Sequence, residues 1–202
     1  MKKENSLDNY KETCFVAGVI HATRFNKNYH FSWLAVGKNT KWDWEGARNY
    51  CRKFCMDSIS IETKAEKNWV KSLIKKEDLH YIWTGGRKCN FKGKLSKPFS
   101  TLNTLQYFLL QGCDRKDFQP IIENGWYWAP TGKRIPAPRK CGHCEWSNTG
   151  GLEERQPDNR EQRQGGKDEA CIGILNNVYN VSQLCVKKEE FVRNFCECIR
   201  ME

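Results

Sequence analysis

The chain lacks an apolar stretch long enough to form a membrane-spanning helix. It contains no apolar run of about 18 residues or more, the length a spanning helix requires. Lys2, Lys3 and Glu4 open the sequence, and the short apolar stretch 14–20 is weaker than the apolar region of a usual signal peptide. An internal repeat is also lacking. The sequence therefore predicts no membrane span and shows no convincing secretion signal.

A catalytic constellation is lacking too. Neither a Ser/His/Asp arrangement nor a pair of carboxylates at a suggestive spacing stands out from the rest of the sequence. The four histidines lie in unrelated contexts, at His21, His30, His80 and His143. We therefore predict that the chain is not an enzyme and that its histidines are ordinary core or surface residues.

Cysteine, by contrast, is abundant. The 202 residues include 11 cysteines, which extend from Cys14 to Cys198. A cytosolic protein rarely carries so many, and their spread suits a disulfide framework in an oxidising compartment. We expect a secreted, extracellular protein. The odd count means that one thiol is unpaired or that the ends of this sequence are not the natural ones.

Size and composition favour one folded domain with a basic surface. Eight Trp, seven Tyr and ten Phe supply enough apolar area for a sizeable core. The net charge is +10, from 34 Lys and Arg against 24 Asp and Glu. This excess favours anionic partners such as sulfated glycans, although the lysines are scattered and can equally form a solvated surface.

Periodicity and turn residues predict a mixed architecture. Residues 29–36 indicate a half-buried strand, and Thr40 is the expected cap of a helix over 42–55. Thr63 and Glu66 form a capping box for a second helix, which ends at about Lys76. Short strands are expected at residues 81–84, 125–128 and 171–175, separated by long loops. The pattern predicts an α+β domain whose loop-rich side is the functional face.

Several motifs, read in order, resemble the C-type lectin-like domain. An aromatic-initiated helix carrying Ala and then Cys is followed by a Trp-containing strand, a Gly-Trp-Tyr-Trp strand, a Trp before a long loop, a Gln-Pro-Asp tripeptide, and an acidic residue two positions before a cysteine. These are residues 44–51, 82–86, 125–128, 144–146, 156–158 and 169–171. The whole set is similar to secreted arthropod members of the family. It implies a C-type lectin-like fold, with two helices flanking small antiparallel sheets, a long loop region and stapling disulfides.

The resemblance also implies a binding site. Calcium needs six to eight oxygen ligands, and Gln156, Asp158 and Glu169 carry suitable amide and carboxylate oxygens. In the family the proline of the tripeptide is cis, and Gln-Pro-Asp is the version associated with galactose-type sugars. Sugar hydroxyls complete the shell of the ion, while an aromatic face covers the apolar side of the sugar. The carbohydrate-binding residues implied are Gln156, Asp158, Glu169 and Trp146.

The sequence departs from the family in two places. The Trp-Asn-Asp or Trp-His-Asp element expected after Cys171 is missing, so we expect calcium to bind this exact chain weakly or not at all. Residues 94–111 form an apolar insertion without cysteine. Both its borders and Asn180-Val181-Ser182 are compatible with splice sites, so retained introns are one hypothesis and a genuine insertion with a diverged C-terminus is the other. Transcript reads across these junctions distinguish them.

The domain boundaries and disulfides follow from the resemblance. Residues 1–28 are expected to be an N-terminal extension, and residues 29–202 the lectin-like domain, with an atypical insertion at 94–111 and an atypical tail from about 181. The family pattern implies three disulfides, Cys51 with Cys196, Cys171 with Cys185, and Cys89 with Cys113. It leaves open the pairing of Cys14, Cys55, Cys141, Cys144 and Cys198.

Three functional interpretations remain. The first is a secreted lectin for galactose-type or other surface glycans, calcium-dependent as in the family, with roles in innate immune recognition or in matrix and cuticle assembly. The second is a lectin-like domain that has lost sugar binding and contacts protein or an anionic matrix; neither interpretation involves nucleic acid. The third, more remote, is a thiol-disulfide oxidoreductase or zinc site at residues 141–144, Cys-Gly-His-Cys, although no helix start follows and no second ligand pair lies nearby.

Overall fold

The computed structural model describes residues 18–91, 113–137, 146–147, 155–166, 168–176, 181–185 and 193–198, the last two segments by their backbone. Eight strands form one sheet: β1 (Ala22–Arg24), β2 (Lys27–Phe31), β3 (Asp57–Ser58), β4 (Tyr81–Lys88), β5 (Trp126–Trp128), β6 (Cys171–Asn176), β7 (Val181–Cys185) and β8 (Arg193–Cys198). Their order is β1-β2-β8-β4-β6-β7, with β3 on β8 and β5 on β4. All pairs are antiparallel except β4 with β8.

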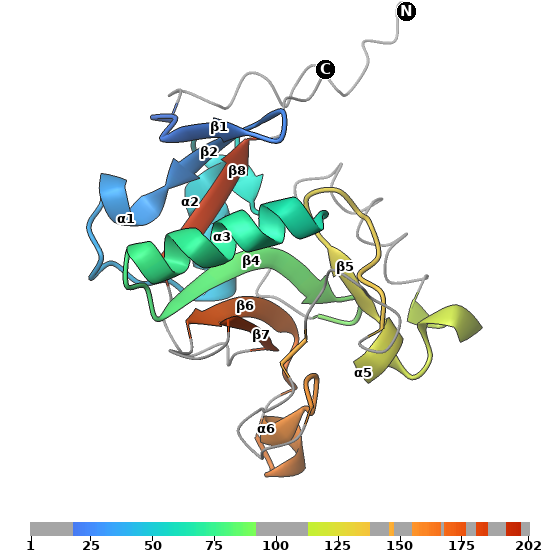
Figure 1. Cartoon of the computed structure of the whole chain (residues 1–202). Helices are drawn as coiled ribbons and strands as arrows, with labels where there is room; N and C mark the ends of the chain where they lie inside the picture. The colour runs from blue at the N-terminus through green and yellow to red at the C-terminus, as the bar shows by residue number, and fades with distance from the viewer. Residues whose placement is uncertain are drawn as a thin grey trace, which may run out of the picture.

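The helices are short and lie around this sheet (Figure 1). They are α1 (Ser32–Ala35), α2 (Trp44–Arg52), α3 (Lys64–Lys76), α5 (Ile121–Asn124) and α6 (Arg160–Arg163), with a 3-10 turn at Lys116–Phe118. Within the described residues, no helix is both long and apolar enough to cross a membrane. The architecture is the predicted α+β arrangement, with two main helices, α2 and α3, beside a mostly antiparallel sheet.

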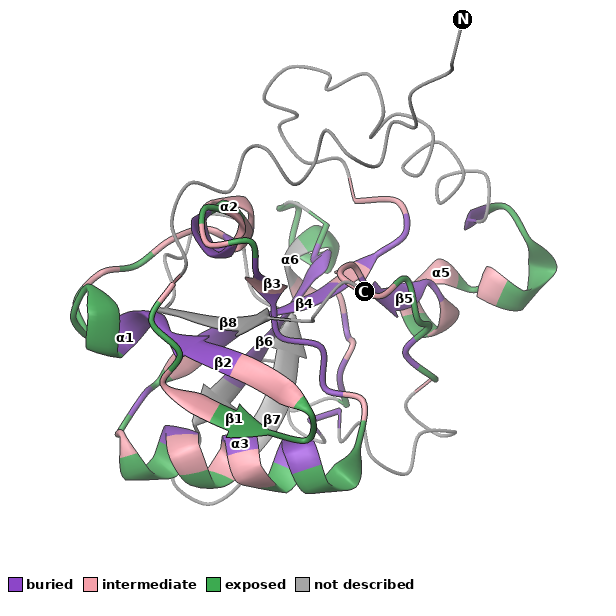
Figure 2. Cartoon of the chain, turned by 90° about the horizontal axis from the view of Figure 1, so that it is seen from above, coloured by how far each residue is buried: buried purple, intermediate pink, exposed green. Residues whose placement is uncertain are grey.

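The second main helix begins where the capping box predicts. The Thr63 hydroxyl accepts a hydrogen bond from the Glu66 backbone N–H at 3.1 Å, which satisfies one of the unpaired donors of the first turn. The Glu66 carboxylate reaches back and accepts from the Glu62 backbone N–H at 3.0 Å. Figure 2 shows that α3 alternates buried and exposed positions along its length, as an amphipathic helix on a sheet must.

The first main helix begins later than predicted. Its cap is Asp43, whose Oδ1 accepts from the Gly46 backbone N–H at 2.7 Å, and the helix runs from Trp44 to Arg52. The prediction of Thr40 as the cap is wrong, because the Thr40 hydroxyl instead donates to the Val36 carbonyl at 2.7 Å. Both residue types make good caps, and the Asp lies directly before the first helical residue.

Two predicted strands have different bounds. The strand expected over 29–36 ends at Phe31, and the next residues form the helix α1. The prediction extended the strand too far because a short apolar run does not distinguish a strand from a helix. The strand expected to stop at Thr84 continues as β4 to Lys88. Its two glycines are strand residues because neighbours approach closely: a Cβ on Gly85 would lie 2.6 Å from Pro130 Cδ. Strand β1 lies within the predicted N-terminal extension.

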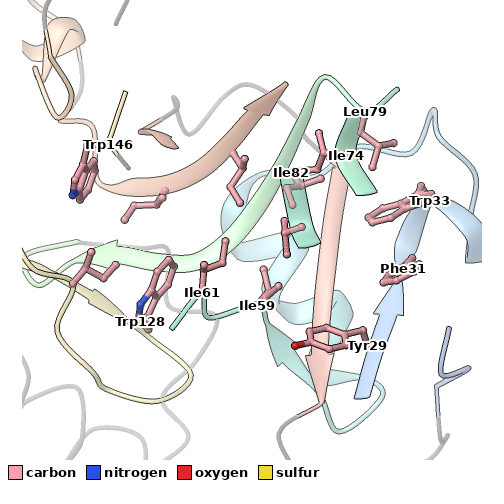
Figure 3. Packing of buried hydrophobic residues seen from close by; sticks show 14 of the residues in the cluster. Tyr29, Phe31, Trp33, Ile59, Ile61, Ile74, Leu79, Ile82, Trp128 and Trp146 are labelled. Atoms are coloured by element: carbon pink, nitrogen blue, oxygen red, sulfur yellow. The ribbon is translucent and has the colours of Figure 1, made fainter. Parts of the chain in front are cut away.

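The core lies between α3 and the sheet and is rich in aromatic and branched residues. Tyr29, Ile59, Val70, Ile82 and Trp126 are completely covered, at 0% exposure. Figure 3 shows part of this core, with Phe31 and Trp33 at one end and Trp128 and Trp146 at the other. A second cluster, around Trp44 and Trp83, packs α2 against β4. The burial of so many large side chains holds the long loops on a rigid frame.

One predicted disulfide is present. Cys89 and Cys113 are bonded, with their Cα atoms 5.7 Å apart. The bond joins the end of β4 to the segment before α5, across the predicted insertion, which lies outside the described residues. Cys141 and Cys144 also lie outside them.

The two longer disulfides stay predictions. Cys51 is disulfide-bonded, and α2, which carries it, packs against β8, which carries Cys196. Cys171 is buried at the start of β6, and the backbone register places its neighbour Ile172 opposite Cys185. The side chains of Cys185 and Cys196 are not among those described. Cys55 is also disulfide-bonded, a pairing that the resemblance leaves open.

Candidate functional site

The Gln-Pro-Asp loop projects from the end of the sheet. Residues 155–166 include α6 and lead into β6, and Figure 1 shows α6 on the opposite side of the molecule from β1 and β2. The Gln156 backbone N–H donates to the Ser147 carbonyl at 2.8 Å, so the loop begins against the residue that follows Trp146. The Gln156–Pro157 peptide is cis, as in the family that the sequence resembles.

Two of the predicted ligands carry buried oxygen atoms without donors. Gln156 is 2% exposed and Asp158 is 9% exposed, although both are polar. Among the described residues, Gln156 Oε1 and Asp158 Oδ2 have no hydrogen-bond partner. The other carboxylate oxygen of Asp158 accepts from the Arg160 backbone N–H at 3.2 Å. A buried acceptor without a donor is unfavourable, so these atoms fit a site that a cation or a ligand hydroxyl completes.

The third predicted ligand, Glu169, lies two residues before β6. Glu169 is 5% exposed, and its backbone N–H donates to Asn159 Oδ1 at 2.9 Å. Asn159 has a positive φ of 50° and also donates from Nδ2 to Asp168 Oδ1 at 2.9 Å. These contacts join the Gln-Pro-Asp loop to the segment that carries Glu169. The structure thus connects Asn159, the residue that directly follows Asp158, to the backbone of Glu169.

The donor chemistry fits a hard cation, but the ligand set is small. Amide and carboxylate oxygens are the ligands that calcium prefers, and Gln156, Asp158 and Glu169 provide both kinds. In the described part of the chain, no group of three or more His, Cys, Asp or Glu side chains could hold a metal ion. Calcium requires six to eight oxygens, which is more than these three side chains could offer by themselves.

Trp146 lies beneath the loop and contributes to the core. Its residue exposure is 5%, and its ring packs edge to face on Trp126, with centroids 5.3 Å apart. Its indole Nε1 is buried and has no hydrogen-bond partner among the described residues. Most of the ring is therefore covered by protein, which limits how much of its face a sugar can contact.

Three residues of this network were not singled out in the sequence. Lys88 on β4 donates to Asp168 Oδ1, and Asp168 in turn accepts from Asn159. Asp168 is adjacent to Glu169, so its proximity to the site follows from the sequence alone. Lys88 is 80 residues away from Asp168, and no local pattern links the two.

A separate pair of histidines, His30 buried and His21 partly buried, lies near the start of the described chain. His30 is 2% exposed; its Nδ1 donates to the Val19 carbonyl at 2.9 Å, and its Nε2 lies 3.0 Å from the Tyr50 hydroxyl. His21 Nδ1 accepts from the Phe31 backbone N–H, and the two rings are 4.9 Å apart. Burial lowers the pKa of both imidazoles, and the proximity of His30 lowers the pKa of His21 further. These histidines are structural and lie far in sequence from the loop.

Comparison with known proteins supports the fold. No family model and no curated protein match the chain. It is similar to the carbohydrate-recognition domain of the mouse scavenger receptor C-type lectin, with a TM-score of 0.53 and 16% identity over 87% of this chain and 92% of that chain. The C-type lectin CEL-I from Cucumaria echinata gives 0.52 and 16% over 88% and 93%. A Ca²⁺-dependent type II antifreeze protein in its Ca²⁺-free form gives 0.52 and 15% over 87% and 94%.

These similarities establish the C-type lectin-like fold, which the sequence predicts. At sequence identities this low, the similarities support a conclusion about the fold alone. The arthropod secreted type stays a prediction, because the named neighbours include proteins of mouse and Cucumaria echinata with the same architecture.

Proposed function

We propose that this chain is a non-enzymatic lectin that binds galactose-type glycans through the Gln-Pro-Asp loop with the help of calcium. One observation carries the proposal: Gln156 Oε1 and Asp158 Oδ2 are buried acceptors without donors, on a loop of a C-type lectin-like fold. Solved neighbours of this fold include a murine dendritic cell receptor domain in complex with an N-glycan.

Each residue has a distinct role in this proposal. Gln156, Asp158 and Glu169 would hold calcium through their side-chain oxygens, and the ion would supply open coordination positions for vicinal sugar hydroxyls. The Asp158 carboxylate accepts from sugar O–H groups, whereas the Gln156 amide both accepts and donates, and this combination defines the orientation of the hydroxyls. Trp146 supports the loop from the core and can offer only a limited part of its ring to the sugar.

Calcium binding is expected to be weak. Extracellular calcium sites with full ligand sets already have dissociation constants of about 10⁻⁴ to 10⁻³ M. This chain has the loop ligands but not the Trp-Asn-Asp or Trp-His-Asp element that supplies further oxygens in the family. The expected affinity of this exact chain for calcium is therefore weaker than millimolar.

The test is retention on immobilised galactose at about 10 mM calcium, a concentration chosen to exceed the expected dissociation constant. Wild type should be retained, released by EDTA, and lost from the column on Asp158→Ala. Asp117→Ala is the matched control: it removes a carboxylate from an exposed cluster with Arg115 and Arg134, distant in sequence from the loop. Retention of Asp158→Ala equal to that of wild type would contradict the proposal.

A second candidate is a lectin-like domain that no longer binds sugar and contacts protein or an anionic matrix. The covered ring of Trp146, the small ligand set and the net charge of +10 favour it. A chain that passes through the galactose column but is retained on a sulfated polysaccharide would support this alternative. An oxidoreductase role at Cys141 is tested separately, because it predicts insulin reduction that Cys141→Ser abolishes. We propose an extracellular location and a recognition role in immunity or matrix assembly for either candidate.

A further inference from the structure

An almost fully buried lysine side chain pairs with Asp168, the residue that precedes Glu169. The Lys88 side chain is 3% exposed, and in the described part of the chain its only hydrogen-bond and ion-pair partner is Asp168 Oδ1. Burial of a charged group is unfavourable unless a counter-charge compensates for it. The Asp168 carboxylate, whose side chain is 31% exposed, provides that counter-charge from the loop side.

The sheet holds Lys88 firmly in this place. Its backbone N–H donates to the Ala170 carbonyl at 2.8 Å, and its register partner on β5 is Trp126. The Lys88 ammonium also lies 5.7 Å from the centroid of the Trp126 ring, which in turn packs on Trp146. A cation over an aromatic face is stabilised by the ring. The charge therefore has a defined position on a rigid element.

The Asp168 carboxylate also contacts the loop that follows the Gln-Pro-Asp tripeptide. Asp168 Oδ1 accepts from both Lys88 Nζ and Asn159 Nδ2, and Asn159 Oδ1 accepts from the Glu169 backbone N–H. Asn159 directly follows the Gln-Pro-Asp tripeptide and has a positive φ, which Asn tolerates better than most residues. A chain of three hydrogen bonds thus runs from β4 to the loop and back to the start of β6.

We infer that Lys88 is a positioning residue whose ammonium serves as a built-in cation, so the loop keeps its shape without a bound metal ion. The buried ion pair needs both partners, and Lys88 already balances the charge of Asp168 without a metal ion. Calcium is then needed for the ligand contacts of Gln156 and Asp158 and not for the order of the loop. This inference rests on the proposed function only in taking this loop as the binding loop.

Limited digestion with trypsin tests the inference. The loop contains Arg155 and Arg163, both exposed, whose cleavage reports local opening. The wild-type loop should be cleaved at the same slow rate in EDTA and in about 10 mM calcium, a concentration above the expected dissociation constant for calcium. Lys88→Gln should be cleaved about tenfold faster in EDTA, because it loses a charge-assisted hydrogen bond. Excess calcium should slow its cleavage again.

Two further variants keep the test decisive. Asp168→Asn removes the same ion pair from the partly exposed side and should open the loop even where Lys88→Gln folds poorly. Lys133→Gln removes an equal charge from an exposed ion pair with Glu62 and should leave loop cleavage unchanged. The inference is overturned if EDTA accelerates wild-type cleavage to the rate of Lys88→Gln, or if Asp168→Asn is as resistant as wild type. Failure of galactose binding alone would count against the proposed function and leave the digestion result intact.

Discussion

Glu66 connects three parts of the fold, so its neutralisation should destabilise the domain strongly. Its side chain is 1% exposed. One carboxylate oxygen accepts from Lys27 Nζ at 3.0 Å and from the Tyr29 hydroxyl at 2.8 Å, and the other accepts from the Glu62 backbone N–H at 3.0 Å. Strand β2, the loop before α3 and the helix itself therefore share one buried carboxylate.

The change Glu66→Gln keeps the shape of the side chain but removes the charge and one acceptor. An amide nitrogen in place of one oxygen faces an N–H or O–H donor, so at least one buried donor loses its partner. Removal of one member of a buried ion pair costs about 3–5 kcal/mol. The Lys27 side chain is 18% exposed, and water compensates part of its charge, so a loss of about 2–4 kcal/mol is expected.

Urea unfolding followed by tryptophan fluorescence measures this loss in the free energy of unfolding. Glu77→Gln is the control, because Glu77 pairs with Lys38 at 3.6 Å and the Lys38 side chain is 47% exposed, so its loss should stay under about 1 kcal/mol. Equal losses for the two variants would refute the reasoning that Glu66 is a buried connection.

Three other outcomes are expected. Cys89→Ser should lower the free energy of unfolding by about 3 kcal/mol in urea titrations, because the bond closes a loop with a sequence separation of 24; a loss under about 1 kcal/mol would contradict this. Acidification below about pH 6.5 should destabilise the domain, because burial lowers the pKa of His30 and the unfolded chain takes up the proton first; His30→Gln should flatten this dependence in thermal melts, and an unchanged slope argues against it. Exchange of Gln156 and Asp158 for Glu and Asn should move retention from galactose to mannose columns, and unchanged preference would exclude a selective role.

The sequence predicted those parts of the fold that local chemistry determines. The capping box at Thr63 and the amphipathic pattern after it located α3, since both signals lie within a few residues. The prediction that the strand continues beyond Phe31 was wrong, because short apolar runs occur in both helices and strands. Strand β4 was cut short at Gly85, where the glycine reflects a close approach by Pro130, a contact that no local pattern reveals.

In the candidate site too, residues in local motifs could be predicted and contacts between distant segments could not. Gln156, Asp158 and Glu169 came from a resemblance in short motifs, and in the structure Asn159, next to Asp158, accepts a hydrogen bond from the Glu169 backbone N–H. Lys88 could not be found in this way, because it pairs with a carboxylate 80 residues away across the sheet. Contacts between distant segments depend on the fold, and a single sequence contains no separate signal for them.

The central claim is that the Gln-Pro-Asp loop is a weak, incomplete cation site that serves sugar binding. Calorimetric titration of calcium into the wild-type chain and into Asp158→Asn, each with galactose in excess, tests it most directly. Wild type should bind calcium with a dissociation constant above about 10⁻³ M, and Asp158→Asn should not bind it measurably. Micromolar binding by wild type, or equal binding by the variant, would contradict the claim.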